Sequence, residues 1–455
     1  MDKIPEIYLL FDALFALEDI REYFRSSLPT TGTAQERSEI TDKIKEIYSL
    51  LQKMESGVHA YPKKYIIDKL EPRIREEAFI NIQPIQAAGR LTPEARKALI
   101  AYADGYSVCD HCLSPFRLDK IHTPPLDQFH RDLATFVGMD EARVVPGARR
   151  GFQAVIHSLV EKGDCVVLSS LAHYTEFLAI EQAGGIPREV PSAANKVTGE
   201  TYAQKIEEIT HETGKAPVLI MLDHFDYMYG NCHDVKGVGK VAREYDIPFL
   251  LNGAYSVGIL PVDGKKNGVD FVIGSGHKSM ASAAPSGMVA TTEQWADTVF
   301  RTTTARGDVS GRKFGIKEVE MLGCTLMGVT LITMMASFPT VKTRVTMWDE
   351  EVKKSNYFLE KFKEVVGSTV LSEEPRAHTL TRVDTTASFD TIARTHKKKG
   401  YFLSSELKSR GIVGPFAGAT RKWKLNTYGL TWEQIKYCAD AFIEIAHQYD
   451  LPVTE

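Results

Sequence analysis

The sequence VDFVIGSGHKS, residues 269–279, joins an apolar run to a lysine surrounded by small residues. VDFVI has the length and composition of a buried strand, and GSGHKS follows where that strand would end. A surface lysine needs no such setting, because its flexible stem reaches water from almost any position. We therefore predict that Lys278 is a covalent anchor.

Short apolar runs alternate with helical stretches from about residue 140 onward. The runs are DCVVLSS (164–170), PVLIML (217–222), IPFLLN (247–252), DFVIG (270–274) and GMVAT (287–291). This alternation predicts an α/β fold with a large, mainly parallel sheet. After a long helical region around residues 318–366, mixed strands and helices predict a smaller C-terminal α+β domain.

The N-terminal region has a different pattern. Apolar residues recur at helical spacing in two stretches separated by the breaker SSLPTTGTAQ, which predicts a helical hairpin. Residues 1–57 hold 7 basic and 11 acidic residues and so carry the whole net charge of −4. The predicted organisation is a hairpin (1–57), a linker (58–80), a catalytic domain (81–340) and a small domain (341–455).

Composition excludes several classes of protein. The net charge of −4 gives no global nucleic-acid signature, so any RNA contact needs a local basic patch. No apolar run reaches membrane-spanning length, and the N-terminus lacks the pattern of a signal peptide. We expect a cytoplasmic protein without membrane contact, in which six cysteines serve thiol chemistry and packing rather than disulfides.

Three motifs upstream of Lys278 give that lysine a context. VVPGARRG (144–151) runs from a strand through a Gly turn into a helix, whose first amides suit a phosphate. SSLAHYTEF places His173 after a strand, where an imidazole can stack on an aromatic ring, and Asn252 ends the strand of FLLNGAYSVG, where its amide can meet a ring nitrogen. Each feature alone more often marks a structural residue than a functional one. Together and in this order they predict a pyridoxal phosphate enzyme of the aspartate aminotransferase type, fold type I.

Asn252 indicates the class of reaction. Most enzymes of this fold have an aspartate there, which keeps the pyridine nitrogen protonated and the ring a strong electron sink. An asparagine holds that proton less firmly, which favours β-elimination and replacement over transamination, because a good leaving group on Cβ needs less assistance.

The thiols allow several interpretations. Cys109 and Cys112 have C-x-x-C spacing in SVCDHC, and Cys324 stands alone in EVEMLGCTLMG. One C-x-x-C is consistent with half a zinc site, a redox pair or chance, and the usual second half of a zinc site is missing. Thiolates near the cofactor would also have a use as carriers of sulfur.

A set of motifs resembles the archaeal O-phosphoseryl-tRNA:cysteinyl-tRNA synthases, in register from about residue 80 to the C-terminus. The motifs are INIQPIQAAGRLTPEARKAL, SVCDHC, PGARRG, AHYTEF, YGNCHDV, LLNGAYSVG, GSGHKSMA, LGCT, ASFPTVKTRVTMWDEEV and LKSRGIVG. The resemblance implies a homodimer that converts phosphoserine on tRNA(Cys) to cysteine, using pyridoxal phosphate and a bound sulfur. Tyr227 and Met228 depart from the family pattern, which has Gly and Asn there.

The resemblance assigns roles to individual residues. Lys278 is implied as the Schiff-base lysine, and His173 is expected from its own motif as a further catalytic and cofactor-binding residue. Cys109, Cys112 and Cys324 are implied as sulfur-handling catalytic thiols, one of them carrying a persulfide, and an iron–sulfur cluster on the three is permitted. The remaining expected cofactor contacts are Ala148, Arg149, Asn252, Ser275, Gly276 and His277, and the expected substrate contacts are Arg149, Arg150 and Tyr174.

Two further expectations concern partners and alternatives. The hairpin resembles a small helical adaptor that links such enzymes to phosphoseryl-tRNA synthetase, although a brace on its own catalytic domain is the competing explanation. The alternative activity is that of a cysteine desulfurase or selenocysteine lyase acting on a free amino acid. A tRNA-channelling scaffold with a vestigial cofactor site is the third hypothesis.

Overall fold

The structure is a computed structural model that describes residues 4–26, 34–52, 79–85, 89–102, 107–108, 126–313, 319–322 and 326–454. The chain forms two compact units. The large unit comprises Ile85–Val352 and Ser372–Thr381, and the small unit comprises Met1–Pro84, Lys353–Leu371 and Arg382–Glu455. The domain boundaries derived from the sequence stay predictions.

The large unit contains most of the helices and strands. Its elements are α4 (Pro93–Tyr102), β2 (Ser107–Val108), α5 (Leu126–Phe136), β3 (Glu141–Val145), α6 (Ala148–Leu159), β4 (Cys165–Ser169), α7 (Tyr174–Gln182), β5 (Ile186–Val190), α8 (Gly199–Thr213), β6 (Leu219–Asp223), α9 (Val235–Glu244), β7 (Phe249–Asn252), η3 (Lys265–Asn267), β8 (Phe271–Ser275), α10 (Gly276–Ser279), β9 (Gly287–Thr291), α11 (Glu293–Val299), α12 (Val319–Leu322), β10 (Leu326–Met327) and α13 (Gly328–Val345). Two elements run from one unit into the other, namely α14 (Trp348–Lys363) and β12 (Leu380–Asp384).

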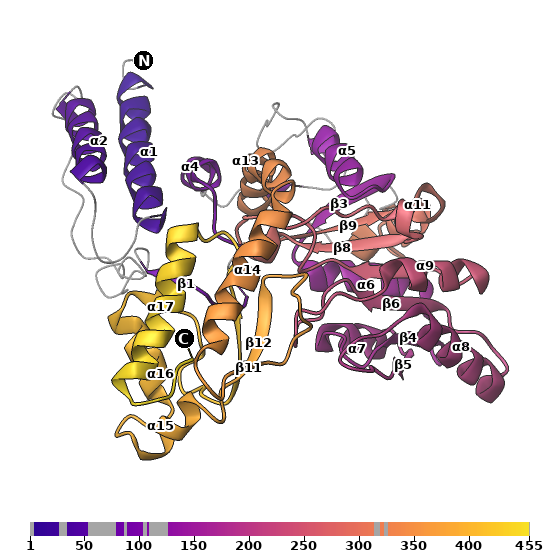
Figure 1. The fold of residues 1–455 in the computed structure, drawn as a ribbon. Coiled ribbons are helices and arrows are strands. Elements are labelled where there is room, and N and C mark those ends of the chain that lie inside the picture. The colour runs from indigo at the N-terminus through magenta and orange to yellow at the C-terminus, as the bar shows by residue number, and fades with distance from the viewer. Residues whose placement is uncertain are drawn as a thin grey trace. The chain divides into compact units, whose positions relative to one another are not determined.

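A seven-stranded sheet organises the large unit. Its order is β3-β9-β8-β7-β6-β4-β5, and Figure 1 shows the strands following one another from β3 to β5. Neighbouring strands from β8 to β5 pair in parallel, whereas β9 runs antiparallel to both β3 and β8. The predicted α/β fold with a mainly parallel sheet is confirmed.

The apolar runs form strands because both faces of the sheet are covered by helices. Alternate residues enter two different hydrophobic clusters, so that Ile220 and Leu222 of β6 belong to one and Leu219 and Met221 to the other. Buried side chains of α5, α8, α9 and α13 complete the first cluster, and those of α6, α7, α11 and α12 complete the second. Strand β5 has no such apolar run, because it lies at the edge of the sheet with Ile186 and Glu189 exposed.

The segment after Lys278 is fixed by polar side chains of α13. Arg344 donates from Nε to the carbonyl of Gly258 at 2.9 Å and from Nη2 to the carbonyl of Ser279. Earlier in α13, Ser337 Oγ donates to the carbonyl of Ala281 at 2.6 Å. Bonds from a packed helix to backbone carbonyls hold a loop that lacks a hydrogen-bonded ladder of its own.

The small unit has its own sheet and core. Its elements are α1 (Ile4–Ser26), α2 (Ala34–Gln52), β1 (Ile80–Asn81), β11 (Thr369–Val370), α15 (Phe389–Thr395), α16 (Tyr401–Ser409), β13 (Ile412–Val413), β14 (Lys422–Asn426) and α17 (Trp432–Gln448). The order β11-β12-β14 forms one sheet, and β1 pairs in parallel with β13. Aromatic side chains fill the core, with Phe362 edge-on to Trp423 at 5.9 Å and to Phe442 at 5.3 Å between ring centroids.

Helices α1 and α2 confirm the two predicted N-terminal helices. They form a small core of Ala13, Ala16 and Ile47, against which Ile20 and Leu50 pack. Among the side chains of these helices that the structure describes, Leu17 is 50% exposed, Ile44 55% and Tyr48 63%. This apolar area is available to a further surface.

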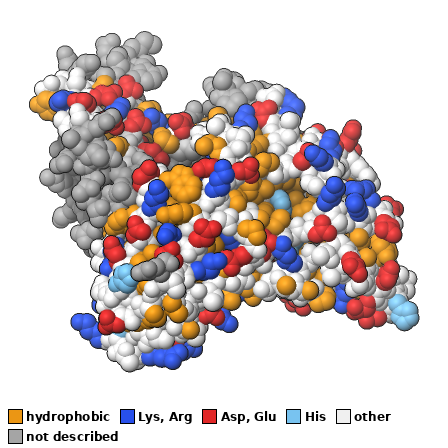
Figure 2. Space-filling model, in the orientation of Figure 1, with side chains coloured by type: hydrophobic (Ala, Val, Ile, Leu, Met, Phe, Trp, Pro, Cys, Tyr) orange, Lys and Arg blue, Asp and Glu red, His pale blue; other side chains and the backbone are white. Residues whose placement is uncertain are grey.

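The surface carries both signs of charge. Figure 2 shows acidic and basic side chains interspersed over the visible face, in keeping with a formal net charge of only −4. Within the described residues, no helix is both long and apolar enough to cross a membrane.

We predict that Tyr202→Phe lowers the free energy of unfolding by about 1 kcal/mol, because the Tyr202 hydroxyl donates to the carbonyl of Met221 at 2.7 Å inside the core. The measurement is denaturant unfolding. The control is Tyr245→Phe, whose hydroxyl bonds to Glu207 at the surface and should change the free energy far less. Equal losses in the two variants would contradict the importance of the buried bond.

Candidate functional site

Most of the predicted site residues meet in one pocket of about 260 Å³ at the carboxyl ends of β6, β7 and β8. In a parallel sheet these ends lie at the same edge, where helices that follow the strands also begin. The pocket is lined by Pro146, Gly147, Ala148, Arg149, Phe152, His173, Thr175, Asp223, Tyr227, Asn252, Ala254, Tyr255, Ser275, His277, Lys278 and Pro285.

Lys278 lies in α10, the single helical turn that follows β8. Its Nζ is 4.8 Å from the centroid of the Tyr255 ring. Burial lowers the pKa of Lys278 below its ordinary value, and the nearby Asp223 carboxyl opposes that shift. A lysine with a lowered pKa more readily presents the neutral amine that a nucleophile or base requires.

The helical turn that contains Lys278 requires a glycine at position 276, because the backbone there passes close to two side chains. A Cβ at this position would lie 2.5 Å from both Met334 Cε and Ser286 Oγ. Gly276 does not line the pocket, so its contribution among the described contacts is to let the chain turn tightly before Lys278.

Asn252 lies between two buried carboxyl groups. Its Nδ2 donates to Glu176 Oε1 at 2.7 Å and to Asp223 Oδ1 at 2.6 Å, and its Oδ1 accepts from the amide of Ala254 at 3.1 Å. Burial raises the pKa of Glu176 to about 8. Burial, together with the carboxyl groups of Glu176 and Asp226, raises the pKa of Asp223 well above its usual range.

His173 caps α7 and lies at the pocket wall. Its Nδ1 lies 2.8 Å from Thr175 Oγ1 and accepts from the Thr175 amide at 3.3 Å. Tyr227 packs edge-on against the imidazole at 4.8 Å between centroids, which fixes the plane of the ring. An imidazole held in this way is suited to stacking on a flat aromatic group.

The opposite end of the pocket is suited to an anion. Helix α6 starts after Gly147, which has φ of 95°, and the amides of its first two residues, Ala148 and Arg149, have no carbonyl four residues back within the helix, whereas the Arg150 amide donates to the carbonyl of Gly147 at 3.0 Å. Ser275 Oγ is buried without a hydrogen-bond partner and lines the same pocket. A phosphate at this position would satisfy both kinds of donor, so the residues fit the predicted phosphate-bearing cofactor.

The remaining predicted residues lie elsewhere or outside the described chain. Arg149 is exposed and lines the pocket, whereas Arg150 and Tyr174 do not line it. Tyr174 is 59% exposed beside His173, with 4.5 Å between ring centroids. Cys109, Cys112 and Cys324 fall outside the described residues, so their arrangement stays a prediction.

The sequence analysis missed Asp223 and Glu176. Asp223 follows the apolar run PVLIML as Asn252 follows IPFLL, and the register pairs these two residues on adjacent parallel strands. The position of both residues at the ends of apolar runs could therefore have identified Asp223 from the sequence. Nothing in the sequence marks Glu176, which reaches Asn252 across 76 residues.

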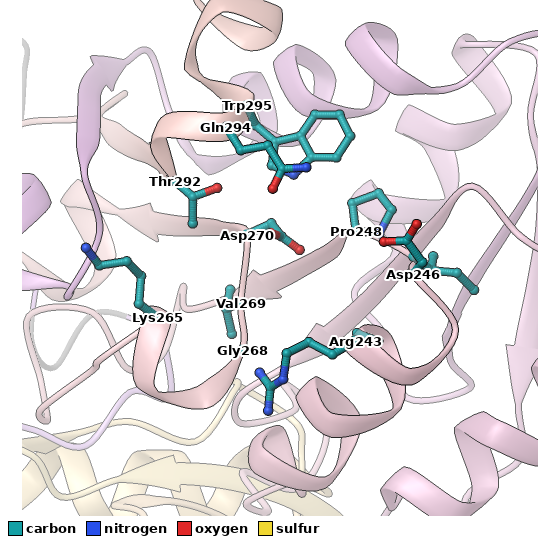
Figure 3. Close-up of a pocket in the computed structure, with 12 residues that line it drawn as sticks. Arg243, Asp246, Pro248, Lys265, Gly268, Val269, Asp270, Thr292, Gln294 and Trp295 are labelled. Atoms are coloured by element: carbon teal, nitrogen blue, oxygen red, sulfur yellow. The ribbon is translucent and has the colours of Figure 1, made fainter.

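A larger cavity of about 490 Å³ lies at the other end of the strands. Figure 3 shows Arg243, Asp270 and Trp295 around it, with Pro248 and Val269 from the segments that precede β7 and β8. None of the predicted site residues lines it. Cavity size alone therefore does not identify the functional site. The predicted residues line the smaller pocket, which lies where β6, β7 and β8 end and which contains Lys278.

The described residues contain no group of three or more His, Cys, Asp or Glu side chains arranged to hold a metal ion. Those residues do not include the three cysteines considered for an iron–sulfur cluster. The cluster stays a prediction.

Comparisons with known proteins give one consistent family. The family model described as O-phosphoseryl-tRNA(Sec) selenium transferase, SepSecS, matches residues 128–448. The O-phospho-L-seryl-tRNA:Cys-tRNA synthase 1 of Methanococcoides burtonii is 64% identical over 447 residues, which cover 98% of this chain and 97% of the relative.

Solved structures agree with the sequence relatives. A crystal structure of a SepCysS–SepCysE N-terminal domain complex matches with a TM-score of 0.75 and 42% identity, over 85% of this chain and 100% of the other. An apo cysteine desulfurase of Thermococcus onnurineus NA1 has a TM-score of 0.65 at 16% identity, over 85% of this chain and 99% of the other, and shows a shared fold alone. The chain therefore belongs to the O-phospho-L-seryl-tRNA:Cys-tRNA synthase family, within the wider group that the SepSecS model describes.

Proposed function

We propose that this protein converts O-phosphoseryl-tRNA(Cys) to cysteinyl-tRNA(Cys) with pyridoxal phosphate as cofactor. The observation that carries the proposal is 64% identity across almost the full length of both this chain and a synthase of that name. The desulfurase alternative has support from the fold alone, at 16% identity. The buried Lys278 in a polar pocket argues against a vestigial site, because an unused lysine would gain nothing from burial.

Each part of the pocket has a place for part of the cofactor. The first amides of α6 and Ser275 Oγ would hold its phosphate, His173 would cover one face of its ring, and Lys278 Nζ would hold its carbonyl carbon. When bound, pyridoxal phosphate supplies an electron sink that permits loss of the Cα proton and departure of phosphate from Cβ.

The protein's own groups position the substrate and move its protons. Lys278 Nζ would remove the Cα proton of the substrate, and burial would assist by favouring the neutral amine. Arg149 would hold the departing phosphate, because Arg149 lines the pocket and a guanidinium offers paired donors to an anion. Arg150 does not line the pocket, which favours Arg149 for this role.

Sulfur delivery is proposed for Cys109, Cys112 and Cys324 through a persulfide on one of them. The pairing of β2 with β10 supports joint action, because it sets Val108 opposite Leu326. Cys109 follows Val108 directly in the chain, and Cys324 precedes Leu326 by two residues. An iron–sulfur cluster on the three cysteines is a further part of this proposal.

The expected partners are tRNA(Cys) carrying phosphoserine, a second copy of the chain and phosphoseryl-tRNA synthetase. For the synthetase we propose docking through residues 1–57, whose helices expose Leu17, Ile44 and Tyr48 and carry net negative charge. The cytoplasmic location expected from the sequence stays a prediction.

We predict that Lys278→Ala lowers turnover of phosphoseryl-tRNA with sulfide at least about 100-fold, because it removes the proton acceptor at Cα. Single-turnover formation of cysteinyl-tRNA is the measurement, and loss of the visible band of the bound cofactor is a second readout. Lys240→Ala, at an exposed position of α9, is the matched control. Turnover within about tenfold of the unmodified protein, equivalent to about 1.4 kcal/mol of barrier, would reject the assignment.

We predict that serine at any one of Cys109, Cys112 or Cys324 costs nearly as much turnover as serine at all three, because residues that act as a unit are not additive. The assay uses a physiological sulfur donor rather than excess sulfide. The control is Cys438→Ala, in the core of the small unit. Unchanged rates in the single variants would show that the thiols are structural.

We predict that Ile44→Asp and Tyr48→Asp each weaken binding to phosphoseryl-tRNA synthetase at least about tenfold, because they place a charge on the exposed apolar surface of α2. Turnover of free phosphoseryl-tRNA should stay unchanged. Lys45→Ala, which removes a surface pair with Asp42, is the control on the same helix. Unchanged affinity with lowered thermal stability would favour the brace explanation.

A further inference from the structure

The acidic net charge of the chain conceals a basic stretch in the small unit. Residues 389–424 contain nine Lys or Arg and two Asp or Glu, which gives a net charge of +7, whereas the whole chain has a net charge of −4. The stretch runs from α15 through α16 to β14, and all of it belongs to the small unit. A local excess of positive charge is what an RNA-binding surface requires, and total charge does not reveal it.

Part of this positive charge is neutralised within the fold. The ion pairs are Arg394–Asp390 (3.6 Å), Arg421–Asp390 (3.2 Å), Lys422–Asp384 (3.7 Å), Arg410–Glu406 (3.0 Å) and Arg410–Glu444 (3.3 Å). Because Asp390 is buried, its two arginine partners are committed to holding α15 against the start of β14. The charge that is available to a ligand must come from the other basic residues.

The turn between α15 and α16 presents three of those residues together. Lys397, Lys398 and Lys399 are exposed and have no ion pair within the part of the chain that the structure describes. The turn is ordered by His396, whose Nδ1 accepts from the Lys398 amide at 3.1 Å and whose carbonyl accepts from the Lys399 amide at 2.8 Å. Three consecutive ammonium groups without acidic partners repel one another and attract an anion.

Two exposed aromatic rings accompany this turn. Tyr401 is 60% exposed and Phe416 is 59% exposed. The loop that contains Phe416 approaches the turn closely, because a Cβ at Gly400 would lie 2.5 Å from the carbonyl oxygen of Gly418. A Cβ at Gly418 would in turn lie 3.7 Å from the Tyr401 ring. Rings that face water beside cations are suited to stacking on nucleic-acid bases.

We propose that residues 397–399, Tyr401 and Phe416 form a surface that binds the RNA of the substrate, tRNA(Cys). This rests on the proposed function, because the RNA is that of phosphoseryl-tRNA. The lysines would contact backbone phosphates and the rings would stack on unpaired bases. Both kinds of side chain are used by RNA, whereas an acidic protein segment would use the lysines alone. None of these residues lines the pocket that contains Lys278, so the surface contributes to binding rather than to the chemical steps.

The first test measures the affinity of the full-length holoenzyme for unacylated tRNA(Cys) over a range of salt concentrations. We expect the combined variant Lys397→Gln, Lys398→Gln and Lys399→Gln to lower that affinity at least about tenfold. The slope of log affinity against log salt concentration should also fall by about 2, because three phosphate contacts release fewer counterions when they are lost. Unchanged affinity in this variant would overturn the inference.

The matched control makes the same change in net charge on the large unit. It combines Lys162→Gln, Lys215→Gln and Lys236→Gln, three exposed positions outside the small unit. We expect the affinity for tRNA(Cys) and the salt slope to stay close to those of the unmodified protein. Equal losses in the two combined variants would show that total charge governs binding, which would also overturn the inference.

The second test concerns the rings. We expect Tyr401→Ala and Phe416→Ala each to lower the affinity for tRNA(Cys) about fivefold or more with an unchanged salt slope, because stacking involves no phosphate contact. Ile186→Ala, on the exposed edge strand β5, is the control. Full affinity in both aromatic variants, or displacement of the tRNA by polyglutamate as readily as by unlabelled RNA, would overturn the RNA assignment in favour of an acidic protein partner.

Turnover separates this inference from the proposed function. In the combined variant at residues 397–399, KM for phosphoseryl-tRNA should rise about tenfold at unchanged kcat, because the surface binds the ground state and the transition state equally. Turnover by the unmodified protein, with no effect of these variants on KM or affinity, would reject the surface and leave the proposed function standing. The expected losses of affinity without any turnover would reject the proposed function and leave the RNA-binding surface in place.

Discussion

The site depends on one side-chain amide held between two buried carboxyl groups. Asn252 connects the end of β7 to the end of β6 through Asp223 and to the first turn of α7 through Glu176. Such bonds are strong in a low-dielectric interior and costly to leave unmade. Because His173 begins α7, the same bonds also set where the imidazole lies relative to the strand ends. The ends of β6 and β7 and the first turn of α7 therefore depend on one another for their positions around the pocket.

The segment around Lys278 is held by a second set of contacts, which are separate from the hydrogen bonds between the strands of the sheet. Arg344 and Ser337 of α13 donate to backbone carbonyls between Gly258 and Ala281. Gly276 lets the chain pass Met334 and Ser286 at a distance that no Cβ allows. Lys278 is thus placed by a rigid frame, and its burial is maintained without a direct ion pair to balance it. This frame suits an amine that has to be neutral for part of a catalytic cycle.

The fold was largely predictable from local pattern, and the site only partly. Apolar runs such as PVLIML and IPFLLN become strands because both of their faces are covered by helices, so composition alone marks them. Edge strand β5 lacks that signature, since Ile186 and Glu189 are exposed. Lys278, His173 and Asn252 were recognisable because each follows a strand or a turn in a characteristic order. Glu176 was not, because its role comes from a contact with a residue 76 positions away.

The sequence by itself determined the α/β fold, the two N-terminal helices, the lysine and the order of the cofactor motifs, because these depend on periodicity and on residues at strand ends. Only the tertiary structure decided what the asparagine does. Its chemistry depends on which atoms surround its amide, and those atoms come from Asp223 on an adjacent strand and Glu176 on a helix. Both hydrogens of the Asn252 amide are used by buried carboxyl groups, which the position of Asn252 at a strand end did not indicate. Hydrogen-bond partners across a fold are set by packing, which no local stretch of sequence encodes.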